Sequence, residues 1–418
     1  MQKNFLKWST FIKGTSKSLE LTLNKICQVT WTRFHHFDLA AELDKMGVLQ
    51  TIFTTLPPWK LAKENVDRSR IRCNFWIEGV RRLARFHPVH ADGLDVQLSE
   101  WHTRRYSKWV AKGLPECRAV FALSGAGLSA GRLAQQRGGI YVCDRGSTHS
   151  RFQNDLMREE HNRWKIPFPP WSEFLIANEE EEYATADAIT VPSNFAKETF
   201  IAQGVDSRKV FVTPYGVNLQ EFYPTESKNG RNIFRILFVG QISLRKGIPD
   251  LLEAFRKFRH PKKELILVGG MQPEMHQFFL SRKLEGIRFV GVVPRNRVRK
   301  YMVESDVMVL PSIEEGQALV LAQALACGVP IIATRNTGAE NLFVHGREGL
   351  IVPFRNPCAL HAALERMAGD QALLESMGNA AKKCSKKLDG WAGYAKQVLG
   401  VLDICERNKF NDIKSESE

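Results

Sequence analysis

The sequence lacks any apolar run long enough to cross a lipid bilayer. Runs such as Val307–Leu310 and Ile331–Ala333 span only a few residues, whereas a membrane-spanning helix needs about 20 apolar residues. The first ten residues mix lysines with Phe5, Leu6 and Trp8 and do not form the continuous apolar core of a secretory signal. We therefore expect a cytoplasmic protein, with peripheral contact to the inner face of the membrane left open.

Paired cysteines and metal-ligand motifs are also lacking. The eight cysteines are scattered, with no Cys-x-x-Cys pair and no histidine at metal-ligand spacing. This pattern argues against a disulfide framework and against a structural zinc site. The chain has no Asp-x-Asp sequence either. We expect reduced thiols, no bound metal and no cofactor.

Positive charge is in excess, since 59 lysines and arginines face 45 acidic residues and give a formal charge of +14. Such a balance suits nucleic acid, an anionic membrane surface or an anionic substrate, and charge alone does not choose among them. The stretch Trp101–Trp109 interleaves cations with aromatics and follows Arg81, Arg82 and Arg85. A helix at an anionic membrane interface and an ordinary amphipathic surface helix explain this stretch equally well.

Short β-type runs alternate with helical stretches along most of the 418 residues. This alternation predicts parallel sheets covered on both faces. A proline- and glycine-containing break at 214–217, followed by the polar run 225–232, is typical of a domain hinge. The predicted organisation is listed by residue range: a basic extension at 1–24, a first domain at 25–215, a second at 216–385, a helix at 386–407 and a flexible tail at 408–418.

The segment Phe238–Gly247 runs from the end of a strand through a glycine turn to a helix start. Backbone N–H groups at such a turn can hold a phosphate. Arg245 and Lys246 add cations suited to a diphosphate, on whose oxygens leaving-group charge accumulates. A basic pair on a surface loop explains this segment equally well.

The segment Leu310–Thr334 is more informative. A buried strand ends at Pro311, two acidic residues and a glycine follow, and a helix of small residues leads to the next strand. Glu315 is expected at the carboxyl edge of the strand, where open α/β sheets bind ligands. Glu314 is interpreted as a solvated loop acid.

These two segments resemble the retaining glycosyltransferases of family four, which share the GT-B architecture. The family pattern is Pro-Ser, then Glu-Gly, then a second Glu eight positions after the first, then Gly-x-Pro. It also has a Gly-Arg-x-x-x-x-Lys-Gly element. The matching residues are Pro311, Ser312, Glu315, Gly316, Gly328, Pro330 and Ala333 in the second segment, and Gly240, Lys246 and Gly247 in the first. The resemblance covers about residues 185–385 and implies two Rossmann-like domains whose parallel sheets face each other across a cleft.

The resemblance also implies roles for individual residues. Lys246 and Arg245 would neutralise the donor diphosphate without a metal, and Glu315 would bond hydroxyls of the transferred sugar. Val293 would border the nucleotide base. The remaining donor-binding candidates are Gly240, Gln241, Gly316, Gln317, Ala318, Leu319 and Gln323, with the amides from Gly316 to Leu319 holding the distal phosphate.

Two substitutions depart from the family pattern. Gln323 stands where the second glutamate accepts hydrogen bonds from the ribose, and Gln241 stands where the arginine follows the first glycine. A glutamine oxygen still accepts a hydrogen bond, at a loss of about 1 kcal/mol relative to a carboxylate. A retuned donor site and a loss of activity are both compatible with these changes.

The N-terminal half should bind the acceptor, in loops that follow its strands. Three loops are candidates, at residues 32–37, 124–128 and 144–149. The last is the most polar. The family often has a histidine directly after the equivalent strand, and either Asp144 or His149 could replace it here.

The resemblance thus implies an enzyme, a hexosyltransferase that moves a sugar from a nucleotide diphosphate sugar to an oligo- or polysaccharide acceptor, with a lipid-linked acceptor left open. The family implies retention of anomeric configuration. Other activities on the same fold, such as a phosphorylase, remain open. A non-catalytic nucleotide-sugar-binding protein and, less favoured, a basic nucleic-acid-binding protein are the alternatives from other classes.

Overall fold

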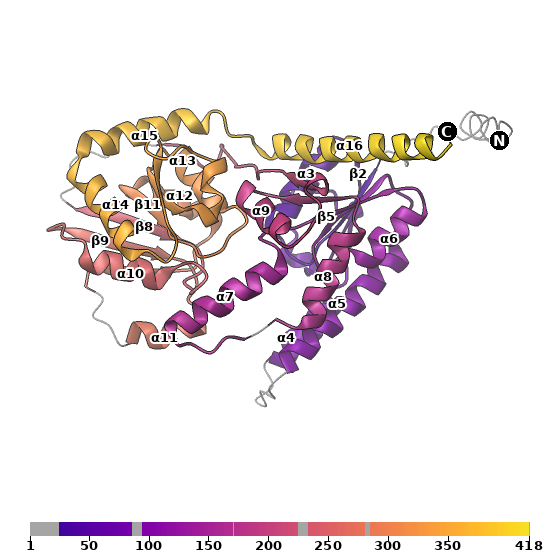
Figure 1. Cartoon of the computed structure of the whole chain (residues 1–418), viewed down its shortest axis with the longest axis horizontal. Coiled ribbons are helices and arrows are strands. Elements are labelled where there is room, and N and C mark those ends of the chain that lie inside the picture. The colour runs from indigo at the N-terminus through magenta and orange to yellow at the C-terminus, as the bar shows by residue number, and fades with distance from the viewer. Residues whose placement is uncertain (1–24, 86–93, 170, 225–232, 281–284, 418) are drawn as a thin grey trace. The chain divides into compact units, whose positions relative to one another are not determined.

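Two parallel sheets form the framework of the chain in a computed structural model, which describes residues 25–85, 94–169, 171–224, 233–280 and 285–417 (Figure 1). The predicted basic extension at 1–24 lies outside the described residues. The first sheet has seven strands in the order β3 (Ile71–Cys73), β2 (Leu49–Thr54), β1 (Ile26–Val29), β4 (Ala119–Leu123), β5 (Ile140–Asp144), β6 (Ala188–Val191) and β7 (Val210–Val212). The pairs from β3 through β6 are parallel.

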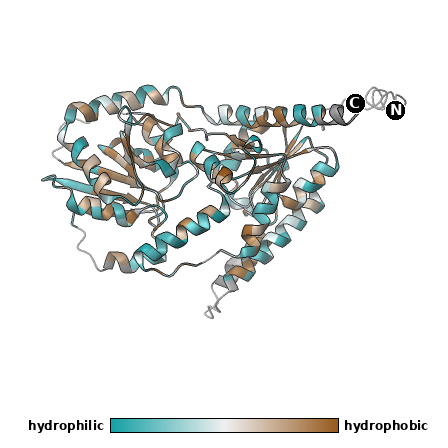
Figure 2. Ribbon diagram, viewed as in Figure 1, coloured by the Kyte–Doolittle hydropathy of each residue, from teal (hydrophilic) through white to brown (hydrophobic). Residues whose placement is uncertain are grey.

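The strands of the first sheet alternate with helices, as the sequence pattern predicts. Every residue of β1 and β5 is buried, which means that both faces of the sheet are covered, because successive side chains point to opposite faces. The helices are α3 (Phe34–Lys45), α4 (Phe75–Arg85), α5 (Leu94–Gly113), α6 (Leu128–Gln136), α7 (Ser150–Trp164), α8 (Glu173–Thr185) and α9 (Asn194–Ala202). Figure 2 shows mostly brown along the strands, and both colours along the helices.

The second sheet has six strands, and all neighbouring pairs run parallel. Their order is β10 (Ile287–Gly291), β9 (Lys263–Val268), β8 (Phe234–Val239), β11 (Val307–Leu310), β12 (Ile331–Thr334) and β13 (Gly349–Val352). The helices are α10 (Ile248–Lys257), α11 (Pro273–Leu280), α12 (Arg295–Val303), α13 (Leu319–Ala326), α14 (Pro357–Gly369), α15 (Gln371–Ser385) and α16 (Trp391–Ser417). The prediction of two covered parallel sheets is confirmed.

Contacts between Cα atoms divide the chain into two compact units that do not follow chain order. The first unit contains the residues up to Asp144, then Trp171–Thr190 and the chain from Ala395 onward. The second contains Arg145–Pro170 and Val191–Tyr394. The loop after β5 and helix α7 therefore belong to the same unit as the second sheet. Helix α16 continues to Ser417, well beyond the predicted helix end at 407.

No helix in the described ranges combines the length and the apolar character that a membrane span requires. The mixed stretch Trp101–Trp109 lies within α5. Its Tyr106 is fully buried and bonds to backbone carbonyls of Thr30 and Phe53. Trp109 packs edge-on against Phe53. The central aromatics of this stretch therefore serve the core of the first unit.

A buried carboxylate organises the glycine-rich loop that follows β4. Glu182 is fully buried, and its carboxylate accepts the N–H groups of Gly125, Gly127 and Leu128 at 2.6–2.8 Å. Burial raises the pKa of Glu182 to about 8, and the three N–H donors act against that rise. In the sequence, the run of four acids at Glu179–Glu182 suggests the solvated first turn of a helix. That interpretation is wrong, because these residues lie in the second half of α8. The amides of this candidate acceptor loop are bound within the fold.

We expect Glu182→Ala to destabilise the protein by about 3 kcal/mol, because it leaves three buried N–H groups without their acceptor. The matched control is Glu181→Ala. That side chain is half-exposed and pairs with Arg132 at the surface, so its removal should cost at most about 1 kcal/mol. Urea unfolding of both variants measures the difference. Equal midpoints for the two variants would contradict the assignment.

Candidate functional site

The loop between β8 and α10 is held against the segment that follows β11. Gly247 precedes α10 with φ +65°, a left-handed conformation that favours glycine. A Cβ atom there would lie 2.0 Å from the carbonyl oxygen of Pro311. The Arg245 carbonyl also accepts the N–H of Ile313 at 2.9 Å. Both contacts place Arg245 and Lys246 beside the carboxyl end of β11.

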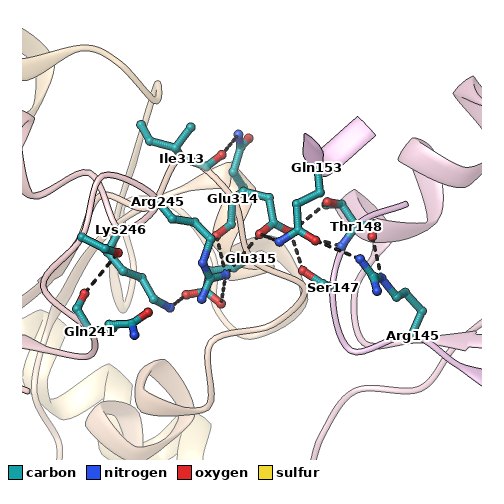
Figure 3. Close-up of polar contacts among 12 residues, drawn as sticks. Arg145, Ser147, Thr148, Gln153, Gln241, Arg245, Lys246, Ile313, Glu314 and Glu315 are labelled. Carbon is teal, nitrogen blue, oxygen red and sulfur yellow. Dashed lines mark hydrogen bonds and ion pairs between the residues drawn. The ribbon is translucent and has the colours of Figure 1, made fainter. Parts of the chain in front are cut away.

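Two cations and two carboxylates meet at this point (Figure 3). Lys246 Nζ forms an ion pair with Glu315. Arg245 Nη1 lies 3.1 Å from Glu314 Oε2 and 3.6 Å from Glu315 Oε2. Burial lowers the pKa of Lys246 well below its ordinary value, the neighbouring Arg245 charge lowers it further, and Glu314 opposes this. An anion placed beside Lys246 would favour its charged form.

Glu314 is the most deeply engaged of these groups. Its side chain is fully buried, and Oε1 accepts from the Ser147 hydroxyl at 2.5 Å and from the Thr148 hydroxyl and N–H at 2.8 and 3.2 Å. Oε2 accepts from Gln153 Nε2 at 2.7 Å and from Arg245. Burial alone would raise the pKa of Glu314, but Arg245 and the two hydroxyls hold it below its ordinary value. The interpretation of Glu314 as a solvated loop acid is wrong.

The polar chain continues into the loop after β5. Arg145 is buried, and its Nη2 donates to Gln153 Oε1 at 2.8 Å while its Nε donates to the Thr148 carbonyl at 2.9 Å. Figure 3 shows Gln153 between Arg145 and Glu314. Arg145 and Arg245 are thereby connected through Gln153 and Glu314, all within the second unit.

The segment that opens α13 is tightly packed. A Cβ atom on Gly316 would lie 2.3 Å from the carbonyl oxygen of Gly146, which explains the glycine. The Gln317 side chain accepts the N–H of Tyr215 at 2.8 Å, and the Ala318 N–H donates to the Thr337 carbonyl at 3.1 Å. The Ala318 amide, one of the predicted phosphate donors, therefore already has a partner inside the fold.

The other donor-side candidates surround the same strand ends. Gly240 follows β8, and Gln241 beside it is exposed. Val293 is half-buried in the turn between β10 and α12. Leu319 begins α13, and Gln323 lies buried within that helix. The structure places these residues around the carboxyl edge of the second sheet, and their contacts with a donor stay a prediction.

Asp144 lies in a buried cluster of the first unit. Its Oδ2 is 2.6 Å from His35 Nε2 and 3.2 Å from His36 Nε2, and its Oδ1 accepts from the Thr190 hydroxyl at 2.7 Å. Burial would raise the pKa of Asp144, but the two histidines keep it below its ordinary value. Burial lowers the pKa of His36. Both histidines belong to α3, where the sequence analysis expects a loop.

Among the described residues, His35, His36 and Asp144 are the group whose side-chain atoms lie close enough together to hold a metal ion. Ligand atoms of His35, His36 and Asp144 all lie within 4.8 Å of one another. The 2.6 Å contact between His35 and Asp144 is itself an ordinary charge-assisted hydrogen bond. The described contacts of Asp144 are thus buried structural ones, and its predicted catalytic role stays a prediction.

His149 occupies a different environment from Asp144. It caps α7, with Nδ1 accepting the Arg151 N–H at 3.3 Å, and its own N–H donates to the Thr199 hydroxyl at 3.0 Å. Its ring packs edge-on against Phe200. These contacts explain a histidine at this position through helix capping, and a catalytic role for it stays a prediction.

Sequence analysis assigned no functional role to Glu314 or Gln153. Ser147 and Thr148 were included only as part of the candidate acceptor loop at 144–149. Gln153 and Glu314 are separated by 161 positions along the chain, and no spacing rule connects them. The one available signal was the doubled acid Glu314-Glu315 directly after a buried strand. Two adjacent carboxylates at a strand end need counter-charges, and Arg245 and Lys246 were already visible.

Two protein-family models match consecutive parts of the chain. "Glycosyltransferase Family 4" matches residues 34–221, and "Glycosyl transferases group 1" matches residues 220–384. Among curated relatives, an uncharacterized glycosyltransferase of Methanocaldococcus jannaschii is 28% identical over 240 residues, covering 53% of this chain and 61% of the relative. The D-inositol 3-phosphate glycosyltransferase of Jonesia denitrificans is 27% identical over 252 residues, covering 55% and 59%. The chain thus matches about three-fifths of the length of these relatives.

Solved structures resemble nearly the whole chain. Sucrose-phosphate synthase from Thermosynechococcus elongatus superposes with a TM-score of 0.69 at 21% identity, covering 93% of this chain and 100% of that one. The Anabaena protein HepE, solved in complex with UDP-glucose, gives a TM-score of 0.67 at 14% identity, covering 91% and 99%. At these identities the likeness concerns the fold, which is GT-B with two Rossmann-like domains. With both family descriptions matched in order along the chain, the protein belongs to the family-four glycosyltransferases of the group 1 type.

Proposed function

We propose that this glycosyltransferase binds a nucleotide diphosphate sugar in its C-terminal half and transfers the sugar, with retention, to a saccharide acceptor. The observation that carries the proposal is the convergence of Arg245, Lys246 and Glu315 at the carboxyl edge of the second sheet. This edge is where open α/β sheets bind ligands. Two cations suit a diphosphate and a carboxylate suits sugar hydroxyls.

The ion pair between Lys246 and Glu315 gives the site two arrangements. Without a donor, Lys246 and Glu315 are each other's partners, with 12% and 11% of their side chains exposed. A bound diphosphate would replace Glu315 as the partner of Lys246 and leave the carboxylate free to accept from the hydroxyls of the sugar. One anion would thus organise both halves of the donor site.

In the transfer step, the bond from the anomeric carbon to the diphosphate oxygen breaks, and a bond to an acceptor hydroxyl forms on the same face of the sugar. The proton of that hydroxyl passes to the departing diphosphate. Lys246 and Arg245 stabilise the negative charge that develops on the leaving group. We infer that these two cations do the work that a divalent metal does in other transferases.

The nucleotide-sugar assignment has support from a relative of the same fold. HepE has been solved with UDP and glucose and with UDP-glucose. Gln241 and Gln323 depart from the family pattern, but Arg245 supplies a cation in the loop between β8 and α10. We therefore infer a retuned donor site with retained activity. Polysaccharide biosynthesis, a lipid-linked acceptor, a cytoplasmic location and contact with an anionic membrane surface belong to the same proposal.

Two non-catalytic interpretations compete with transfer. A scaffold of the same fold would bind nucleotide sugar without hydrolysing it. If the purified protein hydrolyses the donor slowly, the scaffold interpretation is excluded. A nucleic-acid-binding protein would bind RNA with a steep salt dependence that nucleotide sugar does not relieve.

Thermal unfolding with UDP, GDP, ADP and CDP tests the donor site. One nucleotide should raise the unfolding midpoint with or without EDTA, since a ligand at about 100 times its dissociation constant adds about 2.7 kcal/mol. Lys246→Ala should abolish the shift, whereas Lys257→Ala, an exposed lysine paired with Glu253 on α10, should preserve it. The proposal fails if no nucleotide shifts the wild-type midpoint.

Nucleotide affinity should fall as the pH rises above the pKa of Lys246 in the free protein. Burial lowers the pKa of Lys246 in the free protein, and the bound diphosphate raises it again, so binding takes up a proton between the two pKa values. Lys246→Arg keeps its charge over this range and should show a nearly flat profile. Calorimetric titration in two buffers of different ionisation enthalpy measures the proton uptake, and its absence would contradict the exchange of partners.

Glu314→Gln should weaken donor binding about tenfold, or about 1.4 kcal/mol, because Arg245 loses its buried counter-charge and its fixed position. Glu340→Gln is the control. That acid pairs with Arg335 at the surface of the same unit. The donor KM separates the two variants, and equal KM values would show that Glu314 does not position Arg245.

A further inference from the structure

Three aromatic side chains of the first unit, Trp59, Phe75 and Trp76, are in contact. Trp59 and Trp76 are 68% and 69% exposed, and Phe34 is 46% exposed. The Phe75 ring contacts both indoles: its centroid lies 5.6 Å from that of Trp59, edge-on, and 4.9 Å from that of Trp76, stacked. Two indoles exposed to this degree are unusual, because tryptophan is highly buried on average.

The position of this cluster follows from the topology of the sheet. Phe34 begins α3 after β1, Trp59 lies in the 3-10 turn η1 (Pro58–Lys60) after β2, and Phe75 and Trp76 open α4 after β3. These three strands are neighbours and run parallel. All four rings therefore follow the carboxyl ends of adjacent strands, the edge at which open sheets bind ligands.

The loop that carries Trp59 is anchored in the fold. The Arg33 guanidinium donates to the Lys60 carbonyl and pairs with Glu64 at 2.5 Å, which ties this loop to the one after β1. Leu61 and Val66 in the same loop are buried. The indole of Trp59 is thus presented from a fixed segment, which lowers the conformational entropy that a ligand would have to remove.

The chemistry of the cluster fits a carbohydrate better than a bilayer. The C–H face of a pyranose ring is apolar and slightly positive, so it stacks on the negative face of an indole. A helix in a membrane interface needs a continuous apolar face. Among the α4 residues whose burial the structure describes, Phe75–Val80, Ile77 is buried in the fold and the exposed apolar side chains are Trp76 and Val80. Exposed Lys60 beside Trp59 can donate to hydroxyls.

We propose that Trp59 and Trp76, both in contact with Phe75, form an acceptor subsite that stacks the sugar rings of an oligosaccharide. This inference rests on the proposed glycosyl transfer and names the acceptor class and its binding residues. It assigns the acceptor to the loops after β1, β2 and β3. The loop at 124–128 is less suited, because its amides are bound by Glu182.

The test uses the full chain on a printed array of defined oligosaccharides, followed by titration of the best-binding one. Trp59→Ala and Trp76→Ala should each weaken binding about tenfold, and Trp59→Phe should keep most of it, because a stacked aromatic contributes about a factor of ten. Phe410→Ala is the matched control, since Phe410 is 68% exposed on α16. The nucleotide-induced midpoint shift should be the same in all four variants.

The inference is overturned if no oligosaccharide binds, or if binding is equal in the Trp59→Ala/Trp76→Ala double variant. It is also overturned if the double variant loses only sedimentation with vesicles of phosphatidylcholine and phosphatidylglycerol, which would make the cluster a membrane contact. Loss of the nucleotide shift in the wild type would instead refute the donor site. The two failures are therefore distinguishable.

Discussion

The buried carboxylate of Glu314 is the constraint on which the site depends. A carboxylate without exposure to water is stable only if its oxygens are bonded and its charge is balanced. Here hydroxyls of the loop after β5, the amide of Gln153 and the guanidinium of Arg245 meet that requirement together. Segments more than 160 positions apart are thus held at one point, and the direction of Arg245 is fixed as a consequence.

The balance of buried charges also includes the neighbouring ion pair of Lys246 and Glu315. Arg245 and Lys246 face Glu314 and Glu315, so the two cations and two acids nearly cancel. Glu314 is bonded on both oxygens and buried, whereas Glu315 is tied mainly through Lys246. In the proposed function, an incoming diphosphate would therefore compete with Glu315 more easily than with Glu314. The two adjacent glutamates, alike in the sequence, thus differ in their contacts: Glu314 holds Arg245 in place, and Glu315 is the one proposed to exchange partners.

Much of the framework was predictable from the residues. The apolar run Val307–Leu310 forms β11 with the same bounds, and Ile331–Ala333 lies within β12. Buried parallel strands appear in a sequence as such short apolar runs between turn residues. Local errors arose where a helix start lacks a clear cap. Residues 34–37 were expected in a loop and form the first turn of α3, whose N-terminus has no side-chain cap. Glu182 was misjudged because charge favours an exposed interpretation and only tertiary contacts reveal its three N–H donors.

The sequence by itself determined the alternation of strands and helices, the family, and the donor-side candidates Lys246 and Glu315, since these depend on local pattern and spacing. Tertiary structure alone decided that Glu314 is buried, that Asp144 pairs with His35, and that the exposed Trp59 and Trp76 both contact one phenylalanine ring. Burial and counter-charge are set by whichever distant segments pack together. No local pattern carries that information, because residues far apart in the chain become neighbours only after the sheets have formed.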